Sequence, residues 1–181
     1  MLNVLRRGAP GFVTITECEG WRLPEDAVWV DLFEPSREEE TTVEAGLGLD
    51  LPTREEMAAI EPSSRLYQEN GATFMTATLL AHSQEDHPIQ TAVTFVLAKG
   101  VLVTIRYQAM RAFSVYTQRA VQPGVAPNGA EAVLGLLDAI VERLAEILER
   151  TSVQVSDASA SIFHRPRGGA FEPLLTDLAR A

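Results

Sequence analysis

The strongest constraint on the fold is a long helical run that begins at Asn128. Apolar side chains recur every three or four positions, and no proline occurs before Pro166. This spacing places the apolar side chains on one face of an α-helix. About 35 residues, each adding 1.5 Å, form a rod of roughly 50 Å, which is longer than a small domain is wide. The face consists of Val133, Leu136, Leu137, Ile140, Leu144, Ile147, Leu148 and Thr151.

The ends of this run divide the chain. Asn128 and Glu131 have the spacing of a helix N-cap pair, and "PRGG" at 166–169 breaks the helix. We expect an α/β domain over 1–127, a long helix packing on it over 128–165, and the start of a truncated stalk helix over 166–181. Part of the apolar face should pack on the α/β domain. The side chains expected to be buried there are Leu136, Ile140 and Leu144.

Ahead of the rod, the sequence alternates between β-branched or aromatic segments and turn residues, which predicts strands. Alternation is weak in the last three of these segments, as in strands covered on both faces. Lys99-Gly100 predicts a tight hairpin turn, and an antiparallel meander flanked by helices is the simplest arrangement. Strands are expected near 12–17, 27–33, 65–69, 72–82, 89–98 and 101–107.

Two short acidic helices are expected at 36–47 and 53–61, because Ser36 and Thr53 are each followed three residues later by glutamate. The segment from Glu34 to Glu61 contains nine acidic residues and two arginines, so its local net charge is −7. Carboxylates are stabilised by the positive end of the helix dipole, so these acidic residues can simply occupy the solvated first turns of the two helices. They can equally form a cation-attracting surface, and the two interpretations are compatible.

The overall charge and composition exclude several classes of protein. A formal net charge of −10 disfavours nucleic acid and anionic membrane surfaces as partners and favours cations. The single cysteine, Cys18, excludes an intrachain disulfide and indicates a reducing compartment. The start "MLNVLRRGAPGF" has no apolar core of a signal peptide, and no segment reaches the ~18 apolar residues of a membrane span. As given, the chain is expected to be soluble.

The segment "AHSQEDHP" at 81–88 concentrates possible metal ligands: His82, Glu85, Asp86 and His87. Three interpretations remain open. The residues can form a polar hairpin tip that binds nothing, or Glu85 and Asp86 can hold a hard divalent cation weakly through oxygen. A catalytic zinc site needs three protein ligands, but the two histidines lack HExxH spacing and the other histidine, His164, is remote.

The sequence offers little support for an enzyme. It contains no GxSxG, GxGxxG or Walker motif. Its one lysine, Lys99, lies in a turn, which is unsuited to a desolvated Schiff-base lysine. Trp29 and Phe33 alternate with other apolar residues and are expected in the core. We therefore predict no catalytic residues and no organic cofactor.

The order of several segments resembles the cytoplasmic domain of CorA-type divalent-cation transporters. They are "VWVDLFEPSREEE", "LGLDLPTREEMAAIEPSSRLYQENGATFMTATLL", "TFVLAKGVLVTIRY" and "LLDAIVERLAEILERTSVQVSDASASIF". The resemblance covers about residues 27 to 165. It implies an α/β (α+β) fold: an α/β/α sandwich with a central mixed, largely antiparallel sheet and a long C-terminal stalk-type helix.

The resemblance also implies a function. Such transporters are pentamers with two membrane helices per subunit and a Gly-Met-Asn pore signature, which this sequence lacks. We expect a piece that senses intracellular divalent ions and gates an absent pore, at the cytoplasmic face of the bacterial inner membrane. Its partners would be divalent cations and further copies of itself. It would touch no nucleic acid, and would reach the membrane only through a segment beyond Ala181.

In the family, an acidic residue in the loop between the two central strands helps to bind the regulatory ion. That resemblance points to Glu85 and Asp86, with the partnering acid beyond Ala181. The ion would be Mg²⁺ or another divalent cation, weakly bound. His82 and His87 depart from a purely carboxylate set and leave softer ions such as Co²⁺ or Zn²⁺ open.

Two other functions remain as alternatives to the transporter domain. The main one is a standalone acidic α/β binding domain with no membrane partner, and a metal-dependent hydrolase is more distant. The sequence beyond Ala181 would separate the first two: two apolar spans with Gly-Met-Asn would support the transporter, and a stop codon the standalone domain.

Overall fold

The computed structural model of the chain describes residues 1–59, 65–84 and 88–163. The expectations for Glu85, Asp86, His87 and 166–181 lie outside these residues. The described helices are α1 (Arg37–Leu47), α2 (Arg54–Ala59), α3 (Arg111–Ala120) and α4 (Gly129–Phe163). The described strands are β1 (Leu2–Arg6), β2 (Val13–Ile15), β3 (Ala27–Phe33), β4 (Leu66–Glu69), β5 (Ala72–Ala81), β6 (Ile89–Ala98) and β7 (Val101–Arg106).

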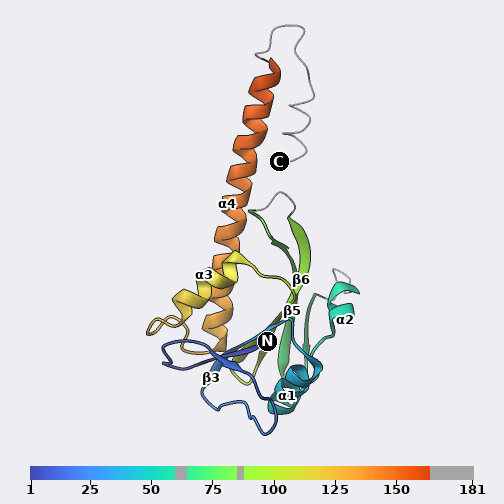
Figure 1. Ribbon diagram of the computed structural model, residues 1–181, viewed down its shortest axis with the longest axis vertical. Coiled ribbons are helices and arrows are strands. Elements are labelled where there is room, and N and C mark those ends of the chain that lie inside the picture. Colours follow the sequence, from blue (N-terminus) through green and yellow to red (C-terminus); the bar gives the residue numbers. More distant parts are fainter. Residues whose placement is uncertain (60–64, 85–87, 164–181) are drawn as a thin grey trace.

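The strands form one seven-stranded sheet in the order β2-β1-β3-β7-β6-β5-β4. Neighbouring strands are antiparallel except for β3 and β7, which are parallel. Helices α1 and α2 cover one face of the sheet, and α3 and α4 cover the other (Figure 1). The expected α/β/α sandwich with a mixed, largely antiparallel sheet is therefore confirmed.

Local sequence signals mark several of these elements correctly. Ser36 caps α1: its Oγ accepts from the Glu39 N–H at 3.3 Å, while the Glu39 carboxylate accepts from the Ser36 N–H at 2.8 Å. The same reciprocal contacts join Thr53 and Glu56 at the start of α2. Lys99-Gly100 forms the expected hairpin turn, with φ of 51° and 81°.

Two elements were not predicted, β1 and α3. Strand β1 is short and is held from both sides by antiparallel pairing with β2 and β3. Helix α3 begins after Met110, whose side chain makes no capping hydrogen bond, and its first turn has no acidic residue. Both lack the local sequence signals found at α1 and α2, so their formation depends on contacts with distant parts of the chain.

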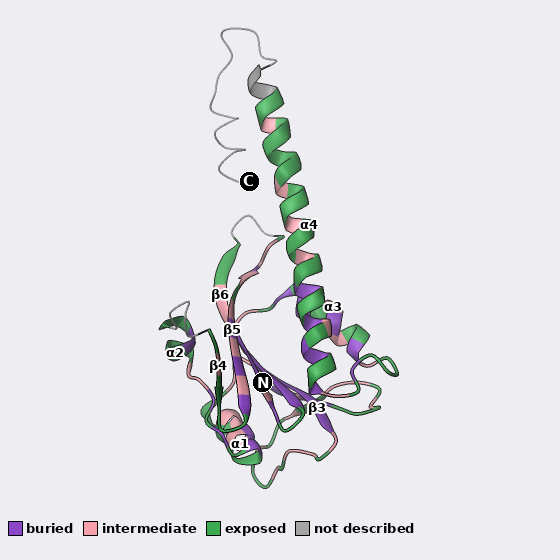
Figure 2. Cartoon of the chain, turned by 180° about the vertical axis from the view of Figure 1, so that it is seen from behind, coloured by how far each residue is buried: buried purple, intermediate pink, exposed green. Residues whose placement is uncertain are grey.

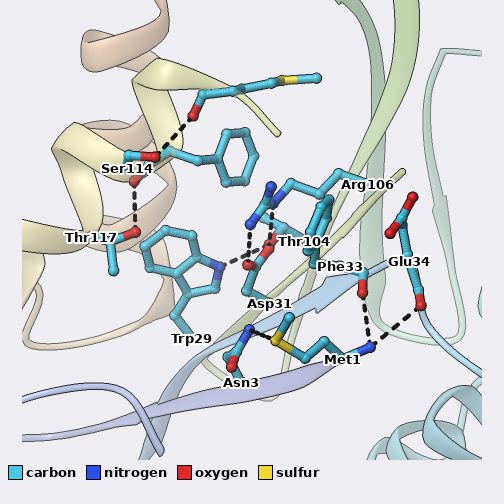
Figure 3. A network of polar contacts seen from close by, with 12 residues as sticks. Met1, Asn3, Trp29, Asp31, Phe33, Glu34, Thr104, Arg106, Ser114 and Thr117 are labelled. Atoms are coloured by element: carbon cyan, nitrogen blue, oxygen red, sulfur yellow. Dashed lines mark hydrogen bonds and ion pairs between the residues drawn. The ribbon is translucent and has the colours of Figure 1, made fainter. Parts of the chain in front are cut away.

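A buried ion pair joins the two parallel strands (Figure 3). Asp31 of β3 accepts hydrogen bonds from Arg106 Nε at 3.0 Å and Nη2 at 2.7 Å, and from Thr104 Oγ1 at 2.8 Å. The Asp31 and Arg106 side chains are only 8% and 13% exposed. Trp29, fully buried as expected, donates from Nε1 to Thr104 Oγ1. Every charge in this buried group therefore has a close partner.

Aromatic rings cover the guanidinium of Arg106. Its Cζ lies 4.4 Å from the centroid of Phe33 and 4.7 Å from that of Phe113 on α3. Phe33 itself is half-buried rather than a full core residue. Rings on a desolvated guanidinium add cation–π stabilisation, so the same pair also attaches α3 to the sheet.

Helix α4 packs on the sheet only through its first turns. Gly129 starts the helix against the β6–β7 turn, where a Cβ would lie 2.4 Å from the Leu102 backbone nitrogen. Leu136 and Ile140 are buried as predicted, at 0% and 7% exposure. Beyond them α4 rises past the sheet, and its residues become exposed (Figure 2). The predicted burial of Leu144 is wrong, since this side chain is 37% exposed.

Removing one half of the buried ion pair should destabilise the fold strongly. We expect Asp31→Ala to lower the free energy of unfolding by about 3–5 kcal/mol, because Arg106 would stay buried without its counter-charge. Asp26→Ala is the matched control, since Asp26 pairs with Arg6 on the surface and its loss should matter little. Urea denaturation followed by circular dichroism measures both, and equal losses would contradict the role of the buried pair.

Alanine substitutions should lower the free energy of unfolding by less and less along α4, because burial decreases along the helix. Leu136→Ala should cost about 2–5 kcal/mol of stability because it leaves a cavity. Leu148→Ala, at a side chain that is 70% exposed, should stay within about 0.5 kcal/mol. The same urea experiment compares the two, and a large loss for Leu148→Ala in the 181-residue chain would show that α4 packs further along its length.

Candidate metal-binding loop

The candidate ligands belong to the loop that joins β5 to β6. The structure describes His82, Ser83 and Gln84 at its start, whereas Glu85, Asp86 and His87 lie outside the described residues. His82 adopts a left-handed backbone conformation with φ of 55°, which turns the chain out of β5. The structure therefore neither brings the four predicted ligands together nor separates them, and the metal site stays a prediction.

His82 is attached to the segment that follows β7. Its Nε2 lies 3.1 Å from Gln108 Oε1. An amide oxygen only accepts, so this contact pairs with an Nε2–H and would compete with a metal at Nε2. The backbone oxygen of Gln108 accepts from Arg106 Nη1 at 3.2 Å. Gln108 thus links the start of the loop to the buried ion pair of Asp31 and Arg106.

Ser83 ties the same loop to α4. Its hydroxyl oxygen accepts from Arg143 Nη2 at 2.7 Å and Nε at 3.2 Å. Its backbone oxygen accepts from the guanidinium of Arg150. Arg143 and Arg150 are seven residues apart, so they lie on one side of the helix, two turns apart. The start of the loop is therefore held from two directions, by α4 and by the end of β7.

Four residues that position the loop were not predicted from the sequence: Ser83, Gln108, Arg143 and Arg150. The seven-residue spacing of the arginines was visible, but it is also typical of an ordinary solvated helix side. Nothing in the sequence around Ser83 indicates that its partners lie 60 and 67 residues away. These contacts depend on how α4 packs against the sheet.

The charges near the loop start are mainly positive. Arg143 donates to Glu146 at 2.7 Å, and this hydrogen bond lowers the pKa of the Glu146 carboxyl. Arg111, at the start of α3, also lowers the pKa of Glu146 through its charge. Among residues 1–59, 65–84 and 88–163, no three His, Cys, Asp or Glu side chains form a group that could hold a metal ion.

Several acidic residues of α1 and α2 accept hydrogen bonds from groups at the ends of these helices and from the amino terminus. Glu39 accepts from the amino terminus as well as from Ser36, and Glu44 accepts from the Leu51 N–H at 2.9 Å. The Thr53 hydrogen bonds lower the pKa of Glu56. These contacts favour the interpretation of the acidic segment as helix-start and helix-end carboxylates.

A cavity of about 280 Å³ opens beside the loop start, between α3 and α4. Apolar side chains from β5 and α4 form one part of its wall, and Arg111, Arg143 and the loop start form another. Separately, no helix within the described ranges has the combination of length and apolar character that a membrane crossing requires.

Several solved structures share this fold. The soluble domain of CorA from Methanocaldococcus jannaschii superimposes with a TM-score of 0.63 at 12% identity, covering 90% of this chain and 64% of that one. The ZntB cytoplasmic domain from Vibrio parahaemolyticus gives 0.58 at 11% identity, covering 87% of this chain and 66% of that one. At such low identity these similarities establish the fold alone.

Sequence comparison is more specific. Magnesium transport protein CorA of Salmonella typhimurium is 33% identical over 155 residues, which cover 85% of this chain and 49% of that protein. The chain therefore spans about half the length of the curated relatives it matches. The model of the family described as CorA-like Mg²⁺ transporter protein matches residues 24–176. From this match, the chain belongs to the CorA-like Mg²⁺ transporter family.

Proposed function

We propose that this chain is the cytoplasmic, ion-sensing part of a CorA-type divalent-cation transporter. It would register intracellular Mg²⁺, or Co²⁺ or Zn²⁺, and control a pore formed by another part of the protein. The observation that supports this most directly is the 33% identity, across 85% of the chain, to a magnesium transport protein. The domain would lie at the cytoplasmic face of the bacterial inner membrane, as a pentamer.

In this proposal the chain divides into three parts. Residues 1–127 sense the ion, 128–165 form the long helix, and 166–181 begin a stalk-type helix that leads to the membrane. The ion would bind at the β5–β6 loop through Glu85 and Asp86, with His82 and His87 as further ligands. Hard divalent cations prefer carboxylates and water, which suits the two acids.

Weak binding follows from the charges around that loop. A net charge of −10 raises the local concentration of cations. At the loop itself, however, Arg143 and Arg150 hold Ser83 and bring two positive charges to within a few residues of the proposed ligands. These guanidinium groups oppose a cation, so occupancy should change in the millimolar range rather than at trace concentrations.

The contacts of Ser83 also provide a physical connection to the rod. Ion binding that displaces the loop start would strain its hydrogen bonds to α4. A ligand at ten times its dissociation constant stabilises the bound state by about 1.4 kcal/mol. Five such sites in a pentamer would supply roughly 7 kcal/mol, more than the ~5.5 kcal/mol that moves a two-state gate from 1:99 to 99:1. Weak sites are therefore sufficient for gating.

We expect the 181-residue chain to bind Mg²⁺ or Co²⁺ with a dissociation constant of about 1 mM or weaker. The double substitution Glu85→Ala with Asp86→Ala should abolish saturable binding in isothermal titration calorimetry. The matched control is Glu17→Ala with Glu19→Ala, which removes two exposed acids far from the loop. Equal loss in both variants would show that only the overall negative charge attracts the ion.

In the full-length transporter, the loop substitutions should change gating but not selectivity. Closure of the Glu85→Ala and Asp86→Ala double variant should require more internal Mg²⁺, because only the differential binding of the gate is altered. Ion selectivity should be unchanged, since it is determined in the pore. Flux into reconstituted vesicles against internal Mg²⁺ tests this, and identical inhibition curves for both proteins would refute the loop as the sensor.

A further inference from the structure

The cavity between α3 and α4 has a two-part wall, and its apolar part has no role in the proposed ion response. Leu79 from β5 and Ile140, Leu144 and Ile147 from α4 provide an apolar part. Arg111 from α3 and Arg143 from α4 also line the cavity. Leu144, wrongly expected to be buried, is instead part of this wall.

The positive charge of the cavity is unusual for this molecule. The whole chain carries 25 acidic and 15 basic residues, yet two arginines from different helices line one cavity. Glu146 is the nearby carboxylate, and it accepts a hydrogen bond from Arg143 Nη1. Arg111 is exposed and donates no hydrogen bond to any residue in the described ranges. Arg111 lines the cavity, and a guanidinium has five N–H donors with which it can bind an external acceptor.

We propose that this cavity binds a small organic anion, with a carboxylate or phosphate on Arg111 and Arg143 and a compact apolar body on the α4 wall. Guanidinium groups bind carboxylates and phosphates through charge-assisted hydrogen bonds. A cavity of about 280 Å³ lies at the small end of ligand sites, which favours an anion of about ten non-hydrogen atoms. The proposal does not require metal binding at the loop.

The arginines would bind the charge of a ligand and the apolar side chains its body, so three probes can distinguish the two contributions to affinity. 4-Fluorobenzoate has both the charge and the apolar body, 4-fluorobenzyl alcohol has only the body, and inorganic phosphate has only the charge. Titrations followed by fluorine NMR on the 181-residue chain should give saturable binding of 4-fluorobenzoate with a dissociation constant of about 1 mM, as expected for a ligand of this size. The alcohol should bind at least tenfold more weakly in the same experiment, and phosphate, which carries no fluorine and is followed by its displacement of 4-fluorobenzoate, should also bind at least tenfold more weakly.

Substitutions at the cavity should reduce this binding without unfolding the chain. Arg111→Gln should weaken 4-fluorobenzoate binding about tenfold, the effect of losing one charged hydrogen bond. Leu144→Glu should abolish it by placing a negative charge on the apolar wall, at an exposed helix position that tolerates glutamate. Arg119→Gln is the matched control, because Arg119 also lies on α3 but pairs with Glu142 outside the cavity.

The outcomes separate the proposal from its alternatives. Loss of binding in Arg111→Gln and Leu144→Glu, with Arg119→Gln unchanged, would support it. Equal affinity for the neutral alcohol would overturn the anion site, as would equal losses in all three variants. No saturable binding of 4-fluorobenzoate to the unmodified chain would also overturn it. The Arg111→Gln variant should bind Mg²⁺ as the unmodified chain does. The anion site and the metal-sensing loop can therefore be refuted separately.

Discussion

The buried pair of Asp31 and Arg106 is the contact on which the architecture depends. It bridges β3 and β7, the one parallel neighbour pair in the described sheet. The two strands are distant in sequence, since α1, α2 and the strands β4 to β6 lie between them. A parallel pair cannot be closed by a short turn, so this seam relies on side chains as well as on the backbone ladder. Phe113 covers the guanidinium and extends the contact to α3.

Hydrogen bonds connect this pair of strands to the candidate loop. Arg106 binds the backbone of Gln108, whose side chain contacts His82. Ser83, the next residue, is bound by Arg143 and Arg150 of α4. A ligand that moves the loop start would therefore act on both the sheet and the rod. The proposed conversion of ion binding into movement of a helix would use these contacts.

The arginines beside the loop have a second consequence, because they give an acidic protein a local positive surface. The loop start, including Ser83, lines the cavity proposed for the anion. Arg143 would contact both Ser83 and the anion, so the two ligands could influence one another. Any such coupling must be reciprocal, since each ligand changes the free energy of the same contacts.

The local structure follows from short-range signals in the sequence. Ser36 and Thr53 mark helix starts, Lys99-Gly100 marks a turn, and the spacing after Asn128 marks a long helix, because these signals act between residues at most four positions apart or along one helix face. Only the tertiary structure decided that Asp31 meets Arg106 across 75 positions, that Ser83 meets Arg143 across 60, and that Leu144 stays exposed. An apolar stripe predicts which side of a helix avoids water, but how far along the helix the sheet reaches depends on contacts between distant segments.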